Sequence, residues 1–248
     1  MAVFSGVDVP QTTHPRSRAE ALAAGDRIGY PLLVKPSNPD GFRRRFRRQA
    51  FRCQSPTELE RAFVDAEPFE PMVQELIPGR DDELYTVGSY IAADGTVLGL
   101  FSGRKLRQSP PGVGTCRVCE AVWVQETVDA ALRLLRAFEF HGVSQVEFKR
   151  DPRDGRYKLM EVNPRLWLWH GLAAAVGVDF ARIAYLDLLG RRGAPVTTEG
   201  KHGRWAITLL AGESPVLERP PYVEPVFSLD DPKPGAAQLA RVVKAAFR

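Results

Sequence analysis

Cysteine is scarce in this chain, and long hydrophobic runs are lacking. Only three of its 248 residues are cysteine, a small and odd number that excludes a disulfide framework. No apolar stretch is long enough to span a membrane, and residues 1–10 lack the basic start and apolar block of a secretion signal. These absences favour a cytoplasmic chain without a membrane segment. With 44% hydrophobic residues, the chain has material for one large or two small domains.

Two of the cysteines, Cys116 and Cys119, form a lone CxxC motif. This spacing is used in metal and redox sites, but no second pair or nearby histidine completes a zinc-binding set. We therefore expect free thiols at both positions.

The net charge of +4 is modest and unevenly distributed. Residues 41–52 interleave six arginines with Phe42, Phe46 and Phe51. Such a segment could bind single-stranded nucleic acid through phosphate contacts and base stacking. It could equally form a mobile basic flap over nucleotide phosphates, or a solvated arginine-rich hairpin. Its residues alone leave these three interpretations open.

Helix and strand signals alternate along the chain. A helix is expected at 17–28, where Ser17 and Glu20 form a capping box, and another at 55–66, with Ser55 as cap and Leu59, Phe63 and Val64 on one side. Residues 37–41 are interpreted as a loop. Strands are expected at 30–36, 50–54 and 71–79, hairpins at 82–106 and 142–164 with Asp-Gly turns, further helices at 126–140 and 236–247, and a late strand at 205–210.

The sequence KLMEVNPRLW at 158–167 places three polar residues at alternate positions of an otherwise buried strand. Glu161, Asn163 and Arg165 therefore share one face of the strand, and Glu147 lies near the middle of its hairpin partner. Adjacent carboxylates repel one another unless a cation lies among them. Mg²⁺ suits this set, because it binds one or two carboxylates and takes its other ligands from water and phosphate. An ion-pair cluster in which Arg165 neutralises both glutamates explains the pattern equally well.

Four motifs in order resemble those of the ATP-grasp superfamily. They are Lys35 in YPLLVKP, VQELIPG followed by Asp82 and Glu83, Glu147 in QVEFK, and EVNPR at 161–165. EVNPRLW followed by AAAVGVDFARIAYLDLLG is most similar to the carbamoyl-phosphate-synthase-like carboxylate–amine ligases. The resemblance runs from about residue 5 to 190 and implies an α+β fold, in which two subdomains with antiparallel sheets clasp the nucleotide. It implies subdomains at 1–73 and 74–190, with residues 191–248 as an extension packing on them.

The resemblance also implies roles for individual residues. Lys35 would contact the ATP phosphates, and backbone groups of Glu75 and Ile77 would bind adenine. The predicted nucleotide-binding residues are Lys35, Gln74, Glu75, Leu76, Ile77 and Glu83, with Asp82 as a competitor of Glu83 for the ribose. Glu147, Glu161 and Asn163 would hold Mg²⁺, or Mn²⁺ in its place. Arg104 or Lys105 would face the γ-phosphate and the second substrate, and Arg165 would stabilise negative charge that develops during the reaction.

The implied reaction joins a small-molecule carboxylate to an amine or related nucleophile through an acyl phosphate, with ATP and Mg²⁺. The arginine-rich segment 41–52 falls where the family places its phosphate-covering lid, which favours ATP over nucleic acid there. The usual N-terminal Rossmann-like domain, with an earlier lysine, does not precede this module in the sequence. We therefore expect one of three cases: the chain is a fragment, a partner supplies this domain, or the site binds nucleotide without turnover.

Four other residues have two interpretations each. His141 and His170 could be acid–base groups, but a histidine without an identified partner is more often structural. Trp167 and Trp169 could line a substrate pocket, and apolar packing beneath the metal residues is expected for at least one of them.

Overall fold

The computed structural model describes residues 6–112, 114–207, 221–228 and 230–246. Helices and mainly antiparallel strands form two compact units, which confirms the α+β class. The smaller unit is Asp8–Pro78, and the larger is Gly79–Arg248 with Met1–Val7. The predicted boundary at 73/74 falls inside strand β4 (Pro71–Glu75), whereas the structure keeps this strand whole in the smaller unit.

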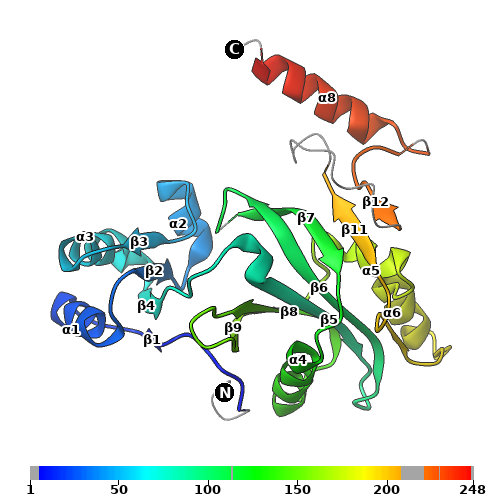
Figure 1. Ribbon diagram of the computed structural model, residues 1–248, viewed down its shortest axis with the longest axis horizontal. Coiled ribbons are helices and arrows are strands. Elements are labelled where there is room, and N and C mark those ends of the chain that lie inside the picture. The colour runs from blue at the N-terminus through cyan, green and yellow to red at the C-terminus, as the bar shows by residue number, and fades with distance from the viewer. Residues whose placement is uncertain (1–5, 113, 208–220, 229, 247–248) are drawn as a thin grey trace. The chain divides into compact units, whose positions relative to one another are not determined.

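The smaller unit is a four-stranded antiparallel sheet with helices packed against it. The strand order is β1-β4-β2-β3, with β1 at Thr12–Thr13, β2 at Leu32–Pro36 and β3 at Phe51–Cys53. Helices α1 (Arg18–Ile28) and α3 (Pro56–Ala66) pack together, and their alanines and leucines share one core with the strands (Figure 1).

Both predicted helix starts of this unit are confirmed. The Ser17 hydroxyl accepts from the Glu20 N–H at 3.2 Å, and the Ser55 hydroxyl accepts from the Glu58 N–H at 3.3 Å. The predicted apolar side of α3 is correct for Leu59 and Phe63, which are buried, and wrong for Val64, which is 48% exposed. Val64 lies beside Phe63 in sequence, about 100° further around the helix, and this turns its side chain to solvent.

The arginine-rich segment is a helix followed by an edge strand rather than a hairpin. Helix α2 (Pro39–Phe46) begins within residues 37–41, so the loop predicted there is wrong. Phe42 and Phe46 lie one turn apart and pack against Phe51 and Phe69 with ring centroids 4.8–6.0 Å apart. This packing stabilises a helix whose Pro, Asp and Gly suggest a loop. Because the Phe42 ring is fully buried, it cannot stack on a base.

The larger unit is built on a long, twisted sheet of eight strands. Seven strands follow the order β12-β11-β7-β6-β5-β8-β9, and β10 pairs with β6 in parallel. The strands are β5 (Leu84–Ile91), β6 (Val97–Ser109), β7 (Thr115–Ala121), β8 (Gly142–Arg150), β9 (Tyr157–Asn163), β10 (Val196–Thr197), β11 (Gly203–Ala206) and β12 (Tyr222–Val223).

Both predicted hairpins are present in this sheet. β5 and β6 are joined at a turn where Gly95 has φ +83°, and β8 and β9 at a turn where Gly155 has φ +75°. β7, which contains both cysteines of the CxxC motif, was not predicted. Of the late strand expected at 205–210, β11 covers the beginning, and residues 208–210 lie outside the described residues.

Helices cover the two faces of the large sheet, and each face has its own core (Figure 1). The expected helix at 126–140 is α4 (Gln125–Ala137), whose Val128, Leu134 and Leu135 pack on Val87 and Val146. On the opposite face, α5 (His170–Ala175) and α6 (Phe180–Leu188) pack with the aromatic core that contains Trp167, Trp169 and Trp205. The remaining helical segments among the described residues are η2 (Glu67–Phe69), η3 (Asp81–Glu83) and α8 (Lys233–Ala246).

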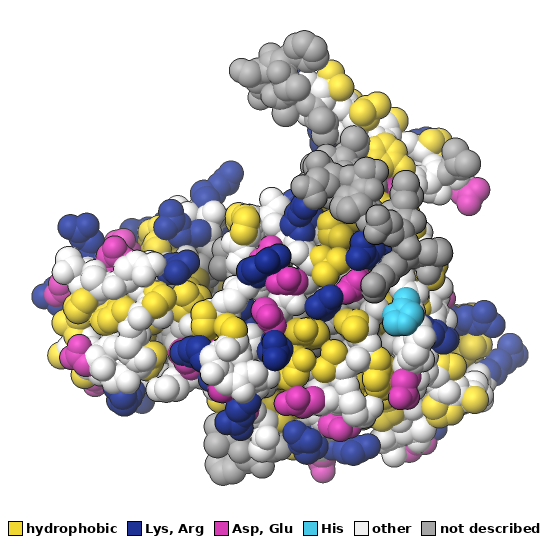
Figure 2. All heavy atoms as spheres, in the orientation of Figure 1, with side chains coloured by type: hydrophobic (Ala, Val, Ile, Leu, Met, Phe, Trp, Pro, Cys, Tyr) yellow, Lys and Arg dark blue, Asp and Glu magenta, His cyan; other side chains and the backbone are white. Residues whose placement is uncertain are grey.

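Helix α8 confirms the expected C-terminal helix, although Leu239 and Val243 on it are about half exposed. No helix in the described part of the chain is both long and apolar enough to cross a membrane. Basic, acidic and hydrophobic side chains are interspersed over the larger unit on the face shown in Figure 2.

Candidate active site

The hairpin of β8 and β9 brings the predicted metal-binding residues together. Glu147 lies directly opposite Glu161 in the strand register, and Gln145 lies opposite Asn163. Side chains at directly opposite positions are about 4.5–5.5 Å apart at Cβ, and like charges placed there destabilise a sheet. The two carboxylates therefore need a cation between or beside them.

Lys105 on β6 supplies a positive charge at this point. Its Nζ lies 2.8 Å from Glu147 Oε1, and both side chains are largely buried, at 11% and 13% exposure. Burial lowers the pKa of the Lys105 ammonium, but the nearby Glu147 carboxylate outweighs that effect and raises it above its usual value. Lys105 thus stays charged across the physiological range.

Arg165 does not neutralise the two glutamates, so the alternative ion-pair cluster is wrong in its choice of cation. Its guanidinium donates to Asn163 Oδ1 at 3.2 Å and to the Leu166 carbonyl at 3.1 Å. The side chain is exposed and follows the end of β9, where it can meet a ligand at the Asn163 side of the cluster.

Arg104 lies on the opposite face of β6 from Lys105, because side chains alternate along a strand. It donates to Glu120 Oε1 at 2.7 Å. Of the two residues predicted to face the second substrate, the structure therefore groups only Lys105 with the glutamates.

Gln145 completes the cluster, and it was missed in the sequence. Its amide donates to Glu147 Oε1 at 3.1 Å and accepts from Asn163 Nδ2 at 3.3 Å, and it is 4% exposed. A continuous chain of contacts thus runs from Lys105 through Glu147, Gln145 and Asn163 to Arg165. Gln145 stands two residues before Glu147, so both side chains lie on the same face of β8. This spacing was the signal available in the sequence.

A small cavity of about 160 Å³ opens beside this cluster. The aromatic floor includes Trp167, whose ring lies against Gly88, and a side chain at Gly88 would clash with it. His170 Nδ1 lies 2.6 Å from the Trp167 carbonyl, which supports a structural role for this histidine. The cavity is lined by Lys105, Gly114, Thr115, Cys116, Gln145, Glu147, Glu161, Asn163, Arg165, Trp167, Leu168 and Trp169.

The two tryptophans belong mainly to the core beneath the cluster. Trp167 and Trp169 are 3% and 2% exposed and pack edge to face, with ring centroids 6.0 Å apart. Cys116 and Cys119 are also buried, and both are free thiols. Burial raises the pKa of the Cys119 thiol well above its usual value, so this thiol stays protonated.

Two of the residues predicted to bind nucleotide, Lys35 and Gln74, are hydrogen-bonded to each other in the smaller unit. Lys35 Nζ donates to Gln74 Oε1 at 2.6 Å, and Gln74 Nε2 donates to Thr12 Oγ1 at 2.9 Å. The Glu75 N–H donates to the Gln11 carbonyl at 2.8 Å, and the Glu75 carboxylate accepts from the Gln11 N–H at 3.1 Å. Leu76 is half-buried and Ile77 is buried.

The predicted ribose-binding acids lie at the start of the larger unit, in η3. Glu83 is partly exposed, and its carboxylate lies 3.8 Å from the Arg150 guanidinium. Its competitor Asp82 lies 3.5 Å from Arg80. Neighbouring Asp81 is structural, since its carboxylate accepts from the N–H groups of Gln108 and Gly112 at 2.8 Å.

The ligands of the cluster on β8 and β9 suit Mg²⁺. The cluster offers two carboxylates and one amide oxygen. A metal bound by protein side chains alone needs more ligands, and no group of three or more His, Cys, Asp or Glu residues in the described part of the chain is placed to hold one. A site with few protein ligands leaves coordination positions for water and phosphate oxygens, which Mg²⁺ prefers.

The comparisons with known proteins agree with this geometry. Residues 120–186, which span β8 and β9, match the family model described as the carbamoyl-phosphate synthase L chain, ATP binding domain. The chain is 26% identical over 180 residues to the D-aspartate ligase of Enterococcus faecium, covering 69% of this chain and 43% of that protein. It is 29% identical over 204 residues to the carbamoyl phosphate synthase large chain of Hyperthermus butylicus, covering 76% and 18%.

Solved structures share the fold. The biotin carboxylase domain of the Hydrogenobacter thermophilus 2-oxoglutarate carboxylase matches with a TM-score of 0.65 at 18% identity, over 82% of this chain and 47% of that one. The N5-carboxyaminoimidazole ribonucleotide synthetase of Thermus thermophilus matches with a TM-score of 0.61 at 17% identity, over 79% and 52%.

The chain shares the ATP-grasp fold with these solved structures, and its residues 120–186 are similar to the ATP-binding domain of carbamoyl-phosphate synthase. The predicted α+β ATP-grasp fold is therefore confirmed. Its sequence relatives lie in the branch of carbamoyl phosphate synthase and D-aspartate ligase, as expected from the EVNPRLW motif. This ATP-grasp chain spans less than half the length of the curated relatives described above.

Proposed function

We propose that this chain is the Mg²⁺-dependent ATP-binding module of a carboxylate–amine ligase. The observation that carries this proposal is the contact chain from Lys105 through Glu147, Gln145 and Asn163 to Arg165, with Glu161 beside it and a small cavity in front. Oxygen ligands and two cations around one cavity suit a phosphoryl transfer, which needs positioning and charge neutralisation more than covalent chemistry.

The reaction we propose begins with attack of a substrate carboxylate on the γ-phosphate of ATP, which releases ADP and leaves an acyl phosphate. An amine then displaces the phosphate. Lys105 and Arg165 would bind the negatively charged oxygens that accumulate in both steps. Glu147, Glu161 and Asn163 would hold Mg²⁺, which when bound neutralises the phosphate oxygens.

The nucleotide contacts of the other predicted residues are also part of this proposal. Lys35 would bind phosphates as a compact point charge, and its present partner Gln74 would hold its ammonium in place. The backbone of residues 74–77 would bind adenine, and Glu83 the ribose. The arginines of 41–52 would cover the phosphates, a role that their exposure and the absence of acids in this segment support.

The substrates and location of the whole protein are proposals too. We assign small-molecule carboxylate and amine substrates because the cavity of about 160 Å³ is small. A partner that supplies a further domain is part of this proposal, because the chain covers 43% of the D-aspartate ligase and 18% of the carbamoyl phosphate synthase large chain. Use of ATP and the three free cysteines support a cytoplasmic protein.

The test is ADP formation from Mg-ATP, measured with a panel of amino acids as carboxylate and amine donors. We expect ADP release with at least one pair in the wild type and in the control Glu199→Ala, and none in Glu161→Ala. Glu199 is an exposed acid outside the cluster, so it controls for loss of charge. A chain that binds Mg-ATP but never forms ADP would instead be a nucleotide-binding module without catalysis.

A further inference from the structure

A second and larger cavity lies on the larger unit, far from the cluster of Lys105 and Glu147. Its volume is about 410 Å³, within the range of roughly 300–1,000 Å³ typical of small-molecule sites. Leu98, near the start of β6, contributes to its wall, and Lys105 is seven residues further along the same strand. At about 3.3 Å per residue the two positions are roughly 23 Å apart, so the cavity is separate from the proposed active site.

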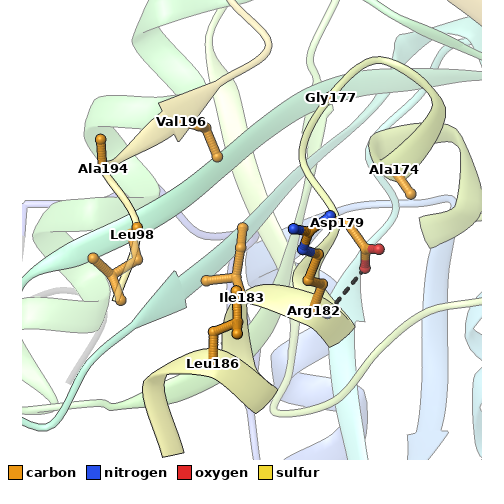
Figure 3. Close-up of a pocket in the computed structure, with 10 residues that line it drawn as sticks. Leu98, Ala174, Gly177, Asp179, Arg182, Ile183, Leu186, Ala194 and Val196 are labelled. Carbon is orange, nitrogen blue, oxygen red and sulfur yellow. Dashed lines mark hydrogen bonds between the residues drawn. The ribbon is translucent and has the colours of Figure 1, made fainter. Parts of the chain in front are cut away.

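The wall of this cavity is mainly aliphatic. Figure 3 shows Ile183 and Leu186 of α6 facing Leu98 and Val196, which come from the two paired strands β6 and β10. Helix α6 and the sheet meet closely behind the cavity. The Ile183 Cδ1 atom lies only 2.9 Å from the position that a Cβ atom would take at Gly99, the neighbour of Leu98. An apolar chain placed here would leave water for aliphatic surface, the main source of binding free energy for such a ligand.

The charged groups around the cavity favour a ligand with a negative charge. Arg182 lines the cavity beside the aliphatic wall (Figure 3), its side chain is exposed, and no acidic partner binds its guanidinium among the described residues. Lys201 Nζ lies 2.7 Å from where a Gly177 Cβ would be, and Gly177 lines the same cavity. The one acid in the wall, Asp179, already caps α6 by accepting from the Arg182 N–H at 3.0 Å.

We propose that this cavity is a binding site for a small aliphatic monocarboxylate, with its chain against Ile183, Leu186 and Leu98 and its carboxylate on Arg182. Guanidinium binds carboxylate through two parallel hydrogen bonds, which fixes the orientation of the ligand as well as its charge. Three large side chains at the end of α6, Tyr185, Leu188 and Leu189, are exposed but do not line the cavity. They are therefore not needed for this ligand.

The test uses isothermal titration calorimetry of the full chain with decanoate, below the concentration at which it forms micelles. The matched ligand is decyltrimethylammonium, which has the same tail and the opposite charge. Arg182→Glu reverses the charge at the cavity, and Arg191→Glu makes the same change at an exposed arginine that does not line it. Circular dichroism checks that both variants are folded.

We expect saturable binding of one decanoate per chain to the wild type and to Arg191→Glu, at least tenfold weaker binding to Arg182→Glu, and no saturable binding of the cation. Equal binding of both ligands, or equal effects of the two variants, would overturn the proposal because charge would play no part. Absence of saturable decanoate binding would also overturn it. A chain that is dimeric by analytical ultracentrifugation and releases no binding heat would show instead that a second copy covers this face.

Discussion

Replacing Lys105 by methionine removes the cation of the Lys105–Glu147 pair and keeps most of its apolar stem. At 2.8 Å the Coulomb attraction between the two charges is about 6 kcal/mol at an effective dielectric constant of 20, and the cost of desolvating both groups offsets part of it. Removing one partner leaves Glu147 charged in a largely buried place, which costs roughly 3–5 kcal/mol. Because both side chains keep a little exposure, we expect Lys105→Met to lower the free energy of unfolding by about 3 kcal/mol, the lower end of this range.

The assay is urea unfolding followed by tryptophan fluorescence. All four tryptophans lie in the larger unit, so this signal reports the unit that contains the pair. The double variant Lys105→Met, Glu147→Gln should recover most of the loss, because no charge is then left unpaired. The control Arg80→Met removes an exposed pair, with Arg80 88% exposed, and should cost under about 1 kcal/mol.

The pH dependence supplies an independent check on the same pair. The folded pKa of Lys105 is raised, so its stabilisation is complete below the unfolded pKa of about 10.4 and is lost as the pH rises through the higher folded value. The difference between the wild type and Lys105→Met should therefore be constant from pH 6 to pH 9 and shrink above about pH 10.4. A loss below about 1 kcal/mol at pH 7, or a difference that vanishes by pH 8, would refute this reasoning.

Three further changes test other parts of the account. Gln145→Leu should weaken Mg²⁺-dependent ATP binding about tenfold or more in calorimetry, since groups that orient metal ligands matter to that extent; unchanged affinity would show that the bridge is dispensable. Gly88→Ala places a Cβ 2.2 Å from Trp167 Cη2 and should cost about 1–3 kcal/mol in urea, whereas a neutral effect would mean that the ring moves freely. Arg153 lowers the pKa of buried Asp151. The Asp151 carboxylate therefore stabilises the fold above its unfolded pKa of about 3.9, and this stabilisation is lost as the pH falls through the lower folded pKa. Asp151→Asn should lower the free energy of unfolding at pH 7 and make it depend less on pH in the acid range.

The hairpin of the candidate site could be predicted because its signals are local. Alternation placed Glu161 and Asn163 on one face, and the Asp-Gly turn predicted the hairpin. The pairing of Glu147 with Glu161 also depends on a register shift between Glu147 and Phe148, which the turn does not set. Lys105 could be named from the family resemblance, but its partner could not be found this way. β6 and β8 are separated in the sheet by β5, so the pair depends on strand order, which local patterns do not encode.

The failures have tertiary causes. Helix α2 has weak intrinsic preference, with proline and glycine in its first turns, and depends on Phe42 packing against distant Phe51 and Phe69. Strand β7 was missed because register shifts in its pairing with β6 interrupt simple alternation and bury both Cys116 and Cys119. Arg104 and Lys105 looked equivalent in sequence, and only the strand geometry separates them.

The most direct test of the central claim is thermal unfolding of the larger unit with and without Mg-ATP. At about a hundred times its dissociation constant, Mg-ATP should stabilise the wild type by roughly 2.7 kcal/mol, and ATP with EDTA should not. The variant Glu161→Ala, Asn163→Ala should unfold at the same temperature with and without Mg-ATP. Equal stabilisation of both proteins, or stabilisation that needs no magnesium, would contradict a metal-dependent nucleotide site on β8 and β9.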